Sequence, residues 1–161
     1  MQTLILPGYS PSNKTWVSDV AENLDVKGVI RPFYWMHWSD ELQKFNAQEK
    51  ADLIVKHIRG DKVNIIAKSL GTLVACLVYK SIPNQIEKMV LNGIPLRDIS
   101  SDEAEIIKSV TMSNRYKVVV FQNRNDPHGT FDEVKFFGNV VATERDDHDY
   151  PFFDKFQSFI K

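Results

Sequence analysis

Short runs of β-branched and other apolar residues alternate along this chain with longer segments of helical period. This alternation restricts the fold most, because strands separated by helices form a parallel sheet with helices packed on its faces. Most of the expected strands are near-continuous apolar runs, typical of strands buried on both faces, and they cover residues 3–6, 29–34, 63–66, 88–91, 117–121 and 139–142. The expected fold class is α/β: a three-layer α/β/α sandwich with a mainly parallel six-stranded sheet.

The segments between these strands carry apolar residues three and four positions apart, as helices with one buried face do. Such spacing relates Trp16, Val20 and Leu24, and it recurs in residues 47–58 and 104–110. Residues 70–79 are apolar on nearly all sides, which predicts a helix packed deep against the centre of the sheet. An aromatic stripe within residues 152–160 predicts a further helix docked at the end of the chain.

Length and charge limit the number of domains and the kinds of partner. The 161 residues suffice for one domain with a sizeable core and are too few for two, so we expect a single domain over residues 1–161. Only about ten residues, 92–101, connect the fourth strand to the next helix, which leaves no room for a cap domain. With 20 Lys and Arg against 21 Asp and Glu, the chain has no basic field to bind nucleic acid.

Cysteine usage and hydropathy indicate the compartment. Cys76 is the only cysteine, so no intramolecular disulfide forms, and no Cys/His cluster has zinc-ligand spacing. We therefore expect no metal and a reducing environment. The first residues lack the basic region of a signal peptide, and no run of about 18 apolar residues occurs that could span a membrane. The expectation is a soluble cytoplasmic protein that does not enter a membrane.

A serine at the junction of a strand and a helix is the most informative local feature. Residues 63–72 read VNIIAKSLGT, which places Ser69 between an apolar β-run and an apolar helical run. In the G-x-S-x-G nucleophile elbow, small residues two before and two after the serine permit a tight turn that exposes the hydroxyl. Gly71 supplies the second small residue, whereas Ala67 replaces the first glycine. A serine that caps a helix would fit the same segment.

With this motif on the expected central strand, the chain resembles the α/β hydrolases, specifically the small capless serine hydrolases of the retinoblastoma-binding-protein type. The resemblance covers nearly all residues, although the two N-terminal antiparallel strands of larger members are missing. It implies a chain order of nucleophile, acid and histidine, with the acid after the penultimate strand and the histidine after the last. Asp126 and His148 occupy these positions, so the implied catalytic residues are Ser69, Asp126 and His148.

Each of these assignments has a plain alternative. Asp126 precedes a proline and could simply begin a turn. Asp98, after the fourth strand, is a competing acid, although the neighbouring Arg97 offers it an ordinary surface ion pair. His148 lies among acidic residues and could be a solvated histidine, so as a base it requires those carboxylates to point away. His128 lies on the loop of Asp126 itself and is expected at the surface.

The resemblance also implies an oxyanion hole and a place for substrate. The backbone amide of Leu70, directly after the serine, is one expected donor, and that of Tyr9, in the loop after the first strand, is the other. An aromatic cluster after the second strand includes Trp35 and Trp38. These two residues are expected to line a substrate pocket, with a core patch beneath a loop as the alternative.

The resulting hypothesis is a serine hydrolase that cleaves a small carboxylic ester or thioester through an acyl-enzyme, without a cofactor or metal. The alternative is a non-catalytic protein- or ligand-binding module on the same fold, which Ala67, the missing strands and the acidic loop around His148 favour. A nucleotide-binding protein is disfavoured because neither G-x-G-x-x-G nor G-x-x-x-x-G-K-[ST] occurs.

Overall fold

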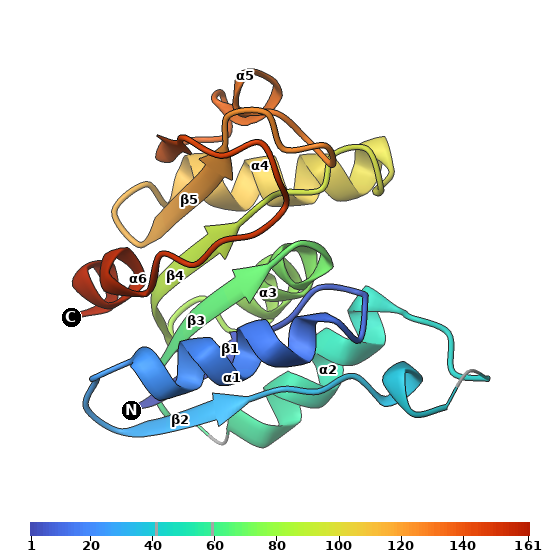
Figure 1. The fold of residues 1–161 in the computed structure, drawn as a ribbon. Helices are drawn as coiled ribbons and strands as arrows, with labels where there is room; N and C mark the ends of the chain where they lie inside the picture. The colour runs from blue at the N-terminus through green and yellow to red at the C-terminus, as the bar shows by residue number, and fades with distance from the viewer. Residues whose placement is uncertain (41, 59) are drawn as a thin grey trace.

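The structure, a computed structural model, describes residues 1–40, 42–58 and 60–161 and is built around one sheet (Figure 1). Six parallel strands form this sheet in the order β2-β1-β3-β4-β5-β6. Their bounds are Gln2–Leu6 (β1), Val29–Pro32 (β2), Val63–Lys68 (β3), Ile86–Asn92 (β4), Val118–Asn123 (β5) and Val140–Thr143 (β6). All six expected strands are present. The second ends two residues early because the chain turns there to pack Trp35 against the loop after β1.

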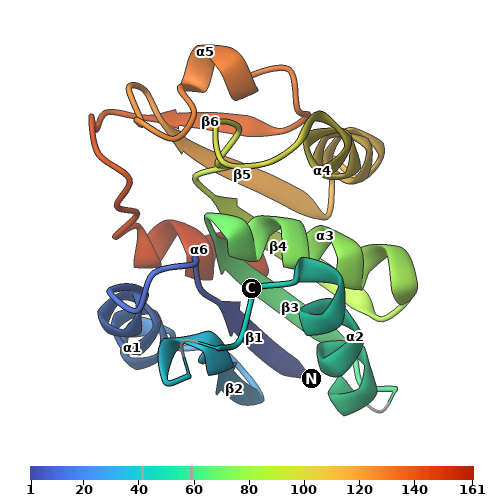
Figure 2. The ribbon, with the colours of Figure 1, turned by 90° about the vertical axis from the view of Figure 1, so that its right-hand side faces the viewer.

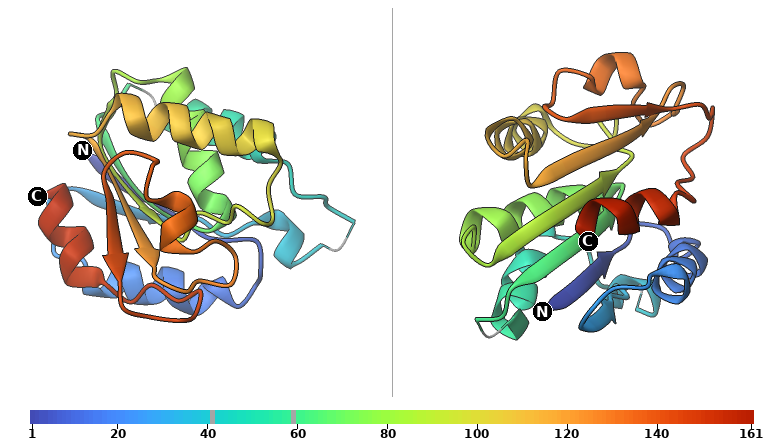
Figure 3. Two further views of the ribbon diagram at one scale, coloured as in Figure 1. Left: turned by 90° about the horizontal axis from the view of Figure 1, so that it is seen from above. Right: turned by 90° about the vertical axis from the view of Figure 1, so that its left-hand side faces the viewer.

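Helices cover both faces of the sheet, as Figure 2 shows along its edge. The elements are Asn13–Asn23 (α1), Ala47–Ile58 (α2), Leu70–Ser81 (α3), Ser101–Ser113 (α4), Phe131–Val134 (α5) and Phe153–Ile160 (α6), with a 3₁₀ turn at Met36–Trp38 (η1). Helices α2, α3 and α4 pack on one face and α1 and α6 on the other (Figure 3). Among the described residues, no helix has the length and apolar character needed to cross a membrane.

Alternating side chains of the strands fill two separate cores. On β1, Leu4 and Leu6 join the cluster beneath α2, α3 and α4, whereas Ile5 joins the cluster beneath α1 and α6. This alternation follows from the two-residue period of a strand and explains why the strands are apolar on both faces. The three-layer α/β/α sandwich is therefore confirmed. Within the described ranges, residues 93–100 connect β4 to α4 without a cap domain.

The order of connections reverses between β1 and β3. From β1 the chain proceeds to β2 on one side, whereas β3, β4, β5 and β6 follow one another on the other side. In open α/β sheets, ligands bind at such a switch point, outside the carboxyl ends of the strands. The loop after β1 and the turn after β3 meet here, because a Cβ built on Gly8 would lie 2.9 Å from the Cβ of Ser69.

Candidate active site

Ser69 occupies the tight turn between β3 and α3. In the described part of the chain it is the only non-glycine residue with a positive φ, with φ 54° and ψ −129°. Hydrogen bonds hold this conformation: the Ser69 N–H donates to the carbonyl of Asn92 (2.9 Å), and the Ser69 carbonyl accepts from Thr72 N–H (2.8 Å) and Thr72 Oγ1 (2.7 Å). Strained residues that the surrounding structure holds in this way cluster at active sites, ligand clamps and switch regions.

The small residues around Ser69 have different roles. A Cβ on Gly71 would lie 2.4 Å from the carbonyl oxygen of Leu6 and 2.6 Å from that of Pro7, so only glycine permits this approach of α3 to the end of β1. Ala67 is fully buried, and its carbonyl accepts a hydrogen bond from Asn92 Nδ2 (2.9 Å). The methyl group that departs from the G-x-S-x-G pattern is therefore accommodated in the core.

Asp126, in the loop after β5, is completely buried and binds three donors. Its Oδ2 accepts hydrogen bonds from His148 Nδ1 (2.7 Å) and the Tyr150 hydroxyl (2.5 Å), and its Oδ1 accepts from His128 N–H (2.8 Å). Burial raises the pKa of this carboxyl group, but the hydrogen bonds outweigh burial, so the pKa lies below its ordinary value. Asp126 is therefore a carboxylate that orients the imidazole of His148.

The acidic neighbours of His148 bind other partners. Asp147 accepts from Arg145 Nε (2.9 Å), Asp149 lies 3.7 Å from Lys68 Nζ, and Asp146 accepts from the side chain of Asn125. Among the residues that the structure describes, the His148 ring hydrogen-bonds to one carboxylate, that of Asp126, through Nδ1. Its other nitrogen, Nε2, is buried and has no hydrogen-bond partner among the described residues.

Ser69 and His148 line a common cavity of about 500 Å³, which we call the Ser69 cavity. In the described part of the chain no hydrogen bond joins the Ser69 hydroxyl to His148. The other residues that line this cavity are Tyr9, Ser10, Ser12, Asn13, Lys68, Leu70, Asp98 and His128. The cavity therefore places a free imidazole nitrogen and a half-buried serine hydroxyl in one space.

Asp98 pairs differently from the sequence-based expectation. Its carboxylate binds Nδ1 of His128 (2.5 Å), whereas Arg97 pairs with Glu133 (3.1 Å). The ring of His128 in turn lies against that of His148, with centroids 4.3 Å apart. His128 is thus half-exposed at the cavity rather than simply at the surface, because the Asp98 carboxylate holds it there.

Tyr9 and Leu70, the expected oxyanion donors, lie together at the mouth of the site. Leu70 is the first residue of α3, where the backbone amides have no partner within the helix. The Tyr9 carbonyl accepts hydrogen bonds from His37 Nε2 (2.8 Å) and Trp38 Nε1 (2.6 Å), which fix the loop. Both residues line the Ser69 cavity.

Trp35 and Trp38 support that loop instead of facing the serine. The Trp35 side chain is buried in the core, and its indole N–H donates to the carbonyls of Pro7 (3.1 Å) and Gly8 (3.0 Å). Within the described ranges, neither indole lines the Ser69 cavity. For Trp35, the core-patch alternative therefore describes the structure.

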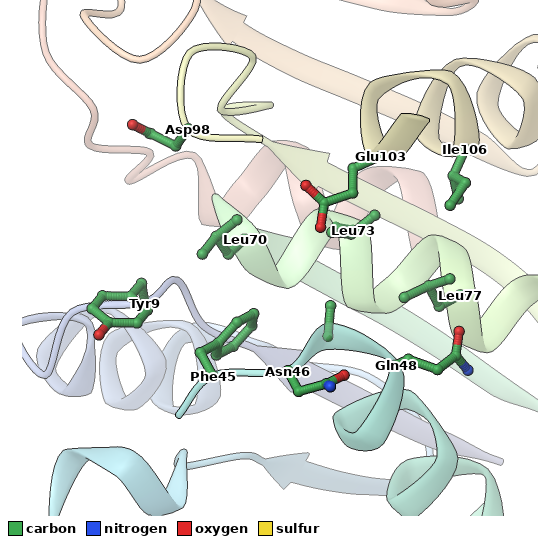
Figure 4. Close-up of a pocket in the computed structure, with 11 residues that line it drawn as sticks. Tyr9, Phe45, Asn46, Gln48, Leu70, Leu73, Leu77, Asp98, Glu103 and Ile106 are labelled. Carbon is green, nitrogen blue, oxygen red and sulfur yellow. The ribbon is translucent and has the colours of Figure 1, made fainter. Parts of the chain in front are cut away.

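A second cavity of about 560 Å³, which we call the α3 cavity, adjoins the first (Figure 4). Tyr9, Leu70 and Asp98 line both cavities. Beyond them, the α3 cavity extends over Leu73 and Leu77 of α3, between the segment that contains Phe45 and helix α4, and its remaining lining residues are Asn46, Ala47, Gln48, Glu103 and Ile106. The two cavities meet directly beside Ser69.

Two residues of the site escaped the sequence analysis. The Tyr150 hydroxyl donates to Asp126 and accepts from Asn123 N–H (3.0 Å), so it ties the acid loop to β5. Gly93 has φ 62°, and a Cβ there would lie 2.5 Å from Tyr150 Cε2 and 2.9 Å from His148 Cε1. No local sequence pattern indicates the role of Tyr150. For Gly93, the one available signal was its position directly after a strand.

Lys68 is a buried cation beside the serine. Its ammonium lies 5.6 Å from the centroid of the Trp16 ring and 3.7 Å from Asp149 Oδ1. Burial lowers the pKa of Lys68 despite the nearby carboxylates. Among the described residues, no group of three or more His, Cys, Asp or Glu side chains is arranged to hold a metal ion.

Comparison with known proteins places the fold. No protein-family model matches the sequence, and no curated protein matches it. Solved structures do match: a protein described as a YdeN-like hydrolase from Pectobacterium atrosepticum has 18% identity and a TM-score of 0.73 over 98% of this chain and 89% of that one.

Two further solved structures share the architecture at 12% identity. Est1E from Butyrivibrio proteoclasticus, solved with ferulic acid bound, has a TM-score of 0.72 over 98% of this chain and 87% of its own. The RedJ thioesterase of the prodiginine pathway in Streptomyces coelicolor has a TM-score of 0.57 over 97% and 80%. Together with the parallel sheet, these similarities establish the α/β-hydrolase fold.

Proposed function

We propose that this chain is a serine hydrolase that cleaves a small carboxylic ester or thioester through an acyl-enzyme intermediate. One observation carries the proposal: Ser69 is held at a positive φ in a cavity that it shares with His148, whose Nδ1 is bound to the buried Asp126. The proposal includes a closer relation to the small capless serine hydrolases of the retinoblastoma-binding-protein type. The fold it shares with solved hydrolases, one of them a thioesterase, supports it.

In the proposed mechanism, Ser69 Oγ attacks the carbonyl carbon of the substrate while His148 Nε2 accepts the hydroxyl proton. The carboxylate of Asp126 stabilises the imidazolium that forms. His148 then gives the proton to the departing alcohol or thiol, which leaves an ester on Ser69. Water, activated by the same nitrogen, releases the acid and restores the serine. The amides of Leu70 and Tyr9 stabilise the oxyanion in both steps.

The absent Ser69–His148 hydrogen bond favours a second candidate, a non-catalytic binding module on the same fold. Catalytic hydrogen bonds are often long without substrate and tighten when it binds, and the unpartnered His148 Nε2 leaves an acceptor for the serine proton. The orphaned nitrogen therefore fits the enzyme, because the proposed proton transfer requires a free acceptor at this position.

Fluorophosphonate labelling and p-nitrophenyl acetate turnover distinguish the two candidates. The enzyme is expected to be labelled at Ser69, and Ser69→Ala is expected to lose labelling and about 10⁴-fold in turnover. Ser10→Ala is a matched control, because Ser10 lines the same cavity on an exposed loop and has no proposed role in proton transfer. Absent labelling of the parent, or equal turnover by Ser69→Ala, would establish the binding module instead.

A further inference from the structure

The two cavities beside Ser69 are lined by different side chains, with a row of leucines in the α3 cavity and mostly polar residues in the Ser69 cavity, and together they define a substrate. Resting on the proposed function, we infer that the substrate is an ester of a medium-length apolar acid with an uncharged, hydroxyl-bearing alcohol. The acyl chain occupies the α3 cavity, and the alcohol occupies the Ser69 cavity.

The position of His148 fixes which part of the ester enters which cavity. The departing oxygen must receive its proton from His148 Nε2, and His148 lines the Ser69 cavity but not the α3 cavity. The alcohol therefore leaves through the Ser69 cavity. The carbonyl oxygen faces the amides of Tyr9 and Leu70, which line both cavities, so the acyl chain continues past Leu70 into the α3 cavity.

The α3 cavity has an apolar track of limited length. Leu70, Leu73 and Leu77 stand at positions i, i+3 and i+7 of α3 and therefore share one helix face (Figure 4). Phe45 and Ile106 flank this row from opposite sides. At 1.5 Å per residue the row spans about 10 Å, which at roughly 1.2 Å per bond of extended chain fits an acyl group of about eight carbons.

The Ser69 cavity offers an unused hydrogen-bond acceptor to the alcohol. Asn13, which lines this cavity, is 8% exposed, and its Oδ1 has no hydrogen-bond partner within residues 1–40, 42–58 and 60–161. Its Nδ2 donates to the Ser10 carbonyl (2.9 Å), which fixes the orientation of the amide. A hydroxyl group on the alcohol that reaches Oδ1 would supply the donor that this buried oxygen lacks.

The charges around the Ser69 cavity favour an uncharged alcohol. Of the described residues that line it, Lys68 is the only Lys or Arg, and Asp149 lies 3.7 Å from its ammonium. Asp98, on the rim of both cavities, carries a second carboxylate. An alcohol or thiol that carries phosphate groups would therefore meet no uncompensated positive charge.

The acyl half is tested with p-nitrophenyl esters of acetic and octanoic acid. Each buried methylene favours binding about fourfold, so even partial burial predicts kcat/KM at least about tenfold higher for octanoate. Ile106→Trp narrows the cavity and is expected to lower kcat/KM for octanoate toward that for acetate, which abolishes this preference. Met112→Trp is the control, because Met112 lies on the same helix, is exposed and lines neither cavity.

The alcohol half is tested with glyceryl monooctanoate against methyl octanoate, which share the acyl group. One hydrogen bond to Asn13 predicts a preference for the glyceryl ester of about three- to tenfold, and Asn13→Leu is expected to abolish it. Asn23→Leu, at the far end of α1 and outside both cavities, is the control and is expected to retain the preference.

The outcomes separate this inference from the proposed function. A parent protein that is labelled at Ser69 but hydrolyses acetate as well as octanoate, or methyl as well as glyceryl ester, overturns the inference alone. The inference also fails if Ile106→Trp retains the octanoate preference or Asn13→Leu the glyceryl preference. A parent that is neither labelled nor active overturns both.

Discussion

Replacing Ser69 by glycine and by alanine measures the strain that the proposed nucleophile elbow stores. Both substitutions remove the hydroxyl, but only glycine adopts φ 54°, ψ −129° without steric cost. A strained residue of this kind costs about 1–3 kcal/mol, and the greater freedom of glycine in the unfolded chain offsets about 0.4–1 kcal/mol of the relief. Urea denaturation should therefore show Ser69→Gly to be about 1–2 kcal/mol more stable than Ser69→Ala.

An unstrained serine provides the matched comparison. Ser109 is exposed in the middle of helix α4, where glycine is about 1 kcal/mol less stable than alanine. The order of the Gly and Ala variants should thus be reversed between positions 109 and 69. If Ser69→Gly is no more stable than Ser69→Ala, the turn is unstrained and the reasoning from its geometry to an exposed nucleophile is refuted.

Three further substitutions test the residues that hold the proposed catalytic groups in place. Asp126→Asn should lower turnover about 10⁴-fold. It should also destabilise the protein near pH 7. Because folding lowers the pKa of Asp126, its carboxylate contributes its full stabilisation above the unfolded pKa of about 3.9. The difference in unfolding free energy between the parent and Asp126→Asn should therefore narrow as the pH falls through the folded-state pKa. A gap that widens in acid contradicts this. Gly93→Ala should reduce turnover while leaving the far-UV circular dichroism spectrum unchanged, because its Cβ would displace His148. Unchanged turnover would show that the added methyl group does not displace His148. Tyr150→Phe leaves the Asn123 N–H without its acceptor and should cost about 1–3 kcal/mol in urea denaturation, and a neutral effect would show that water replaces the hydroxyl.

The fold could be predicted because its signal is local. Each buried strand is an apolar run, and each covering helix repeats apolar residues three and four apart, so the order of elements follows from neighbouring residues alone. The sequence predicted only roughly that Ser69, Asp126 and His148 lie near one another, because parallel strands bring their carboxyl ends to one edge of the sheet. The sequence does not determine which loop residues meet there.

The details that could not be predicted depend on side-chain directions in loops. Trp35 is an aromatic residue of the kind that lines substrate pockets. Its indole nevertheless points into the core, where its N–H donates to the carbonyls of the loop after β1. Asp98 precedes the penultimate strand and pairs with His128, a contact between residues 30 positions apart. Tyr150 reaches Asp126 across 24 positions. Such contacts are settled by tertiary packing, which a pattern of neighbouring residues does not contain.

Trapping the acyl-enzyme tests the central claim most directly. The parent protein would be mixed with p-nitrophenyl octanoate, quenched in acid during turnover, digested and examined by mass spectrometry. The proposed mechanism predicts an octanoyl group on the peptide that contains Ser69, accompanied by a burst of p-nitrophenol, and neither in Ser69→Ala. Turnover without any acyl group on Ser69, or with the group on another residue, would contradict it.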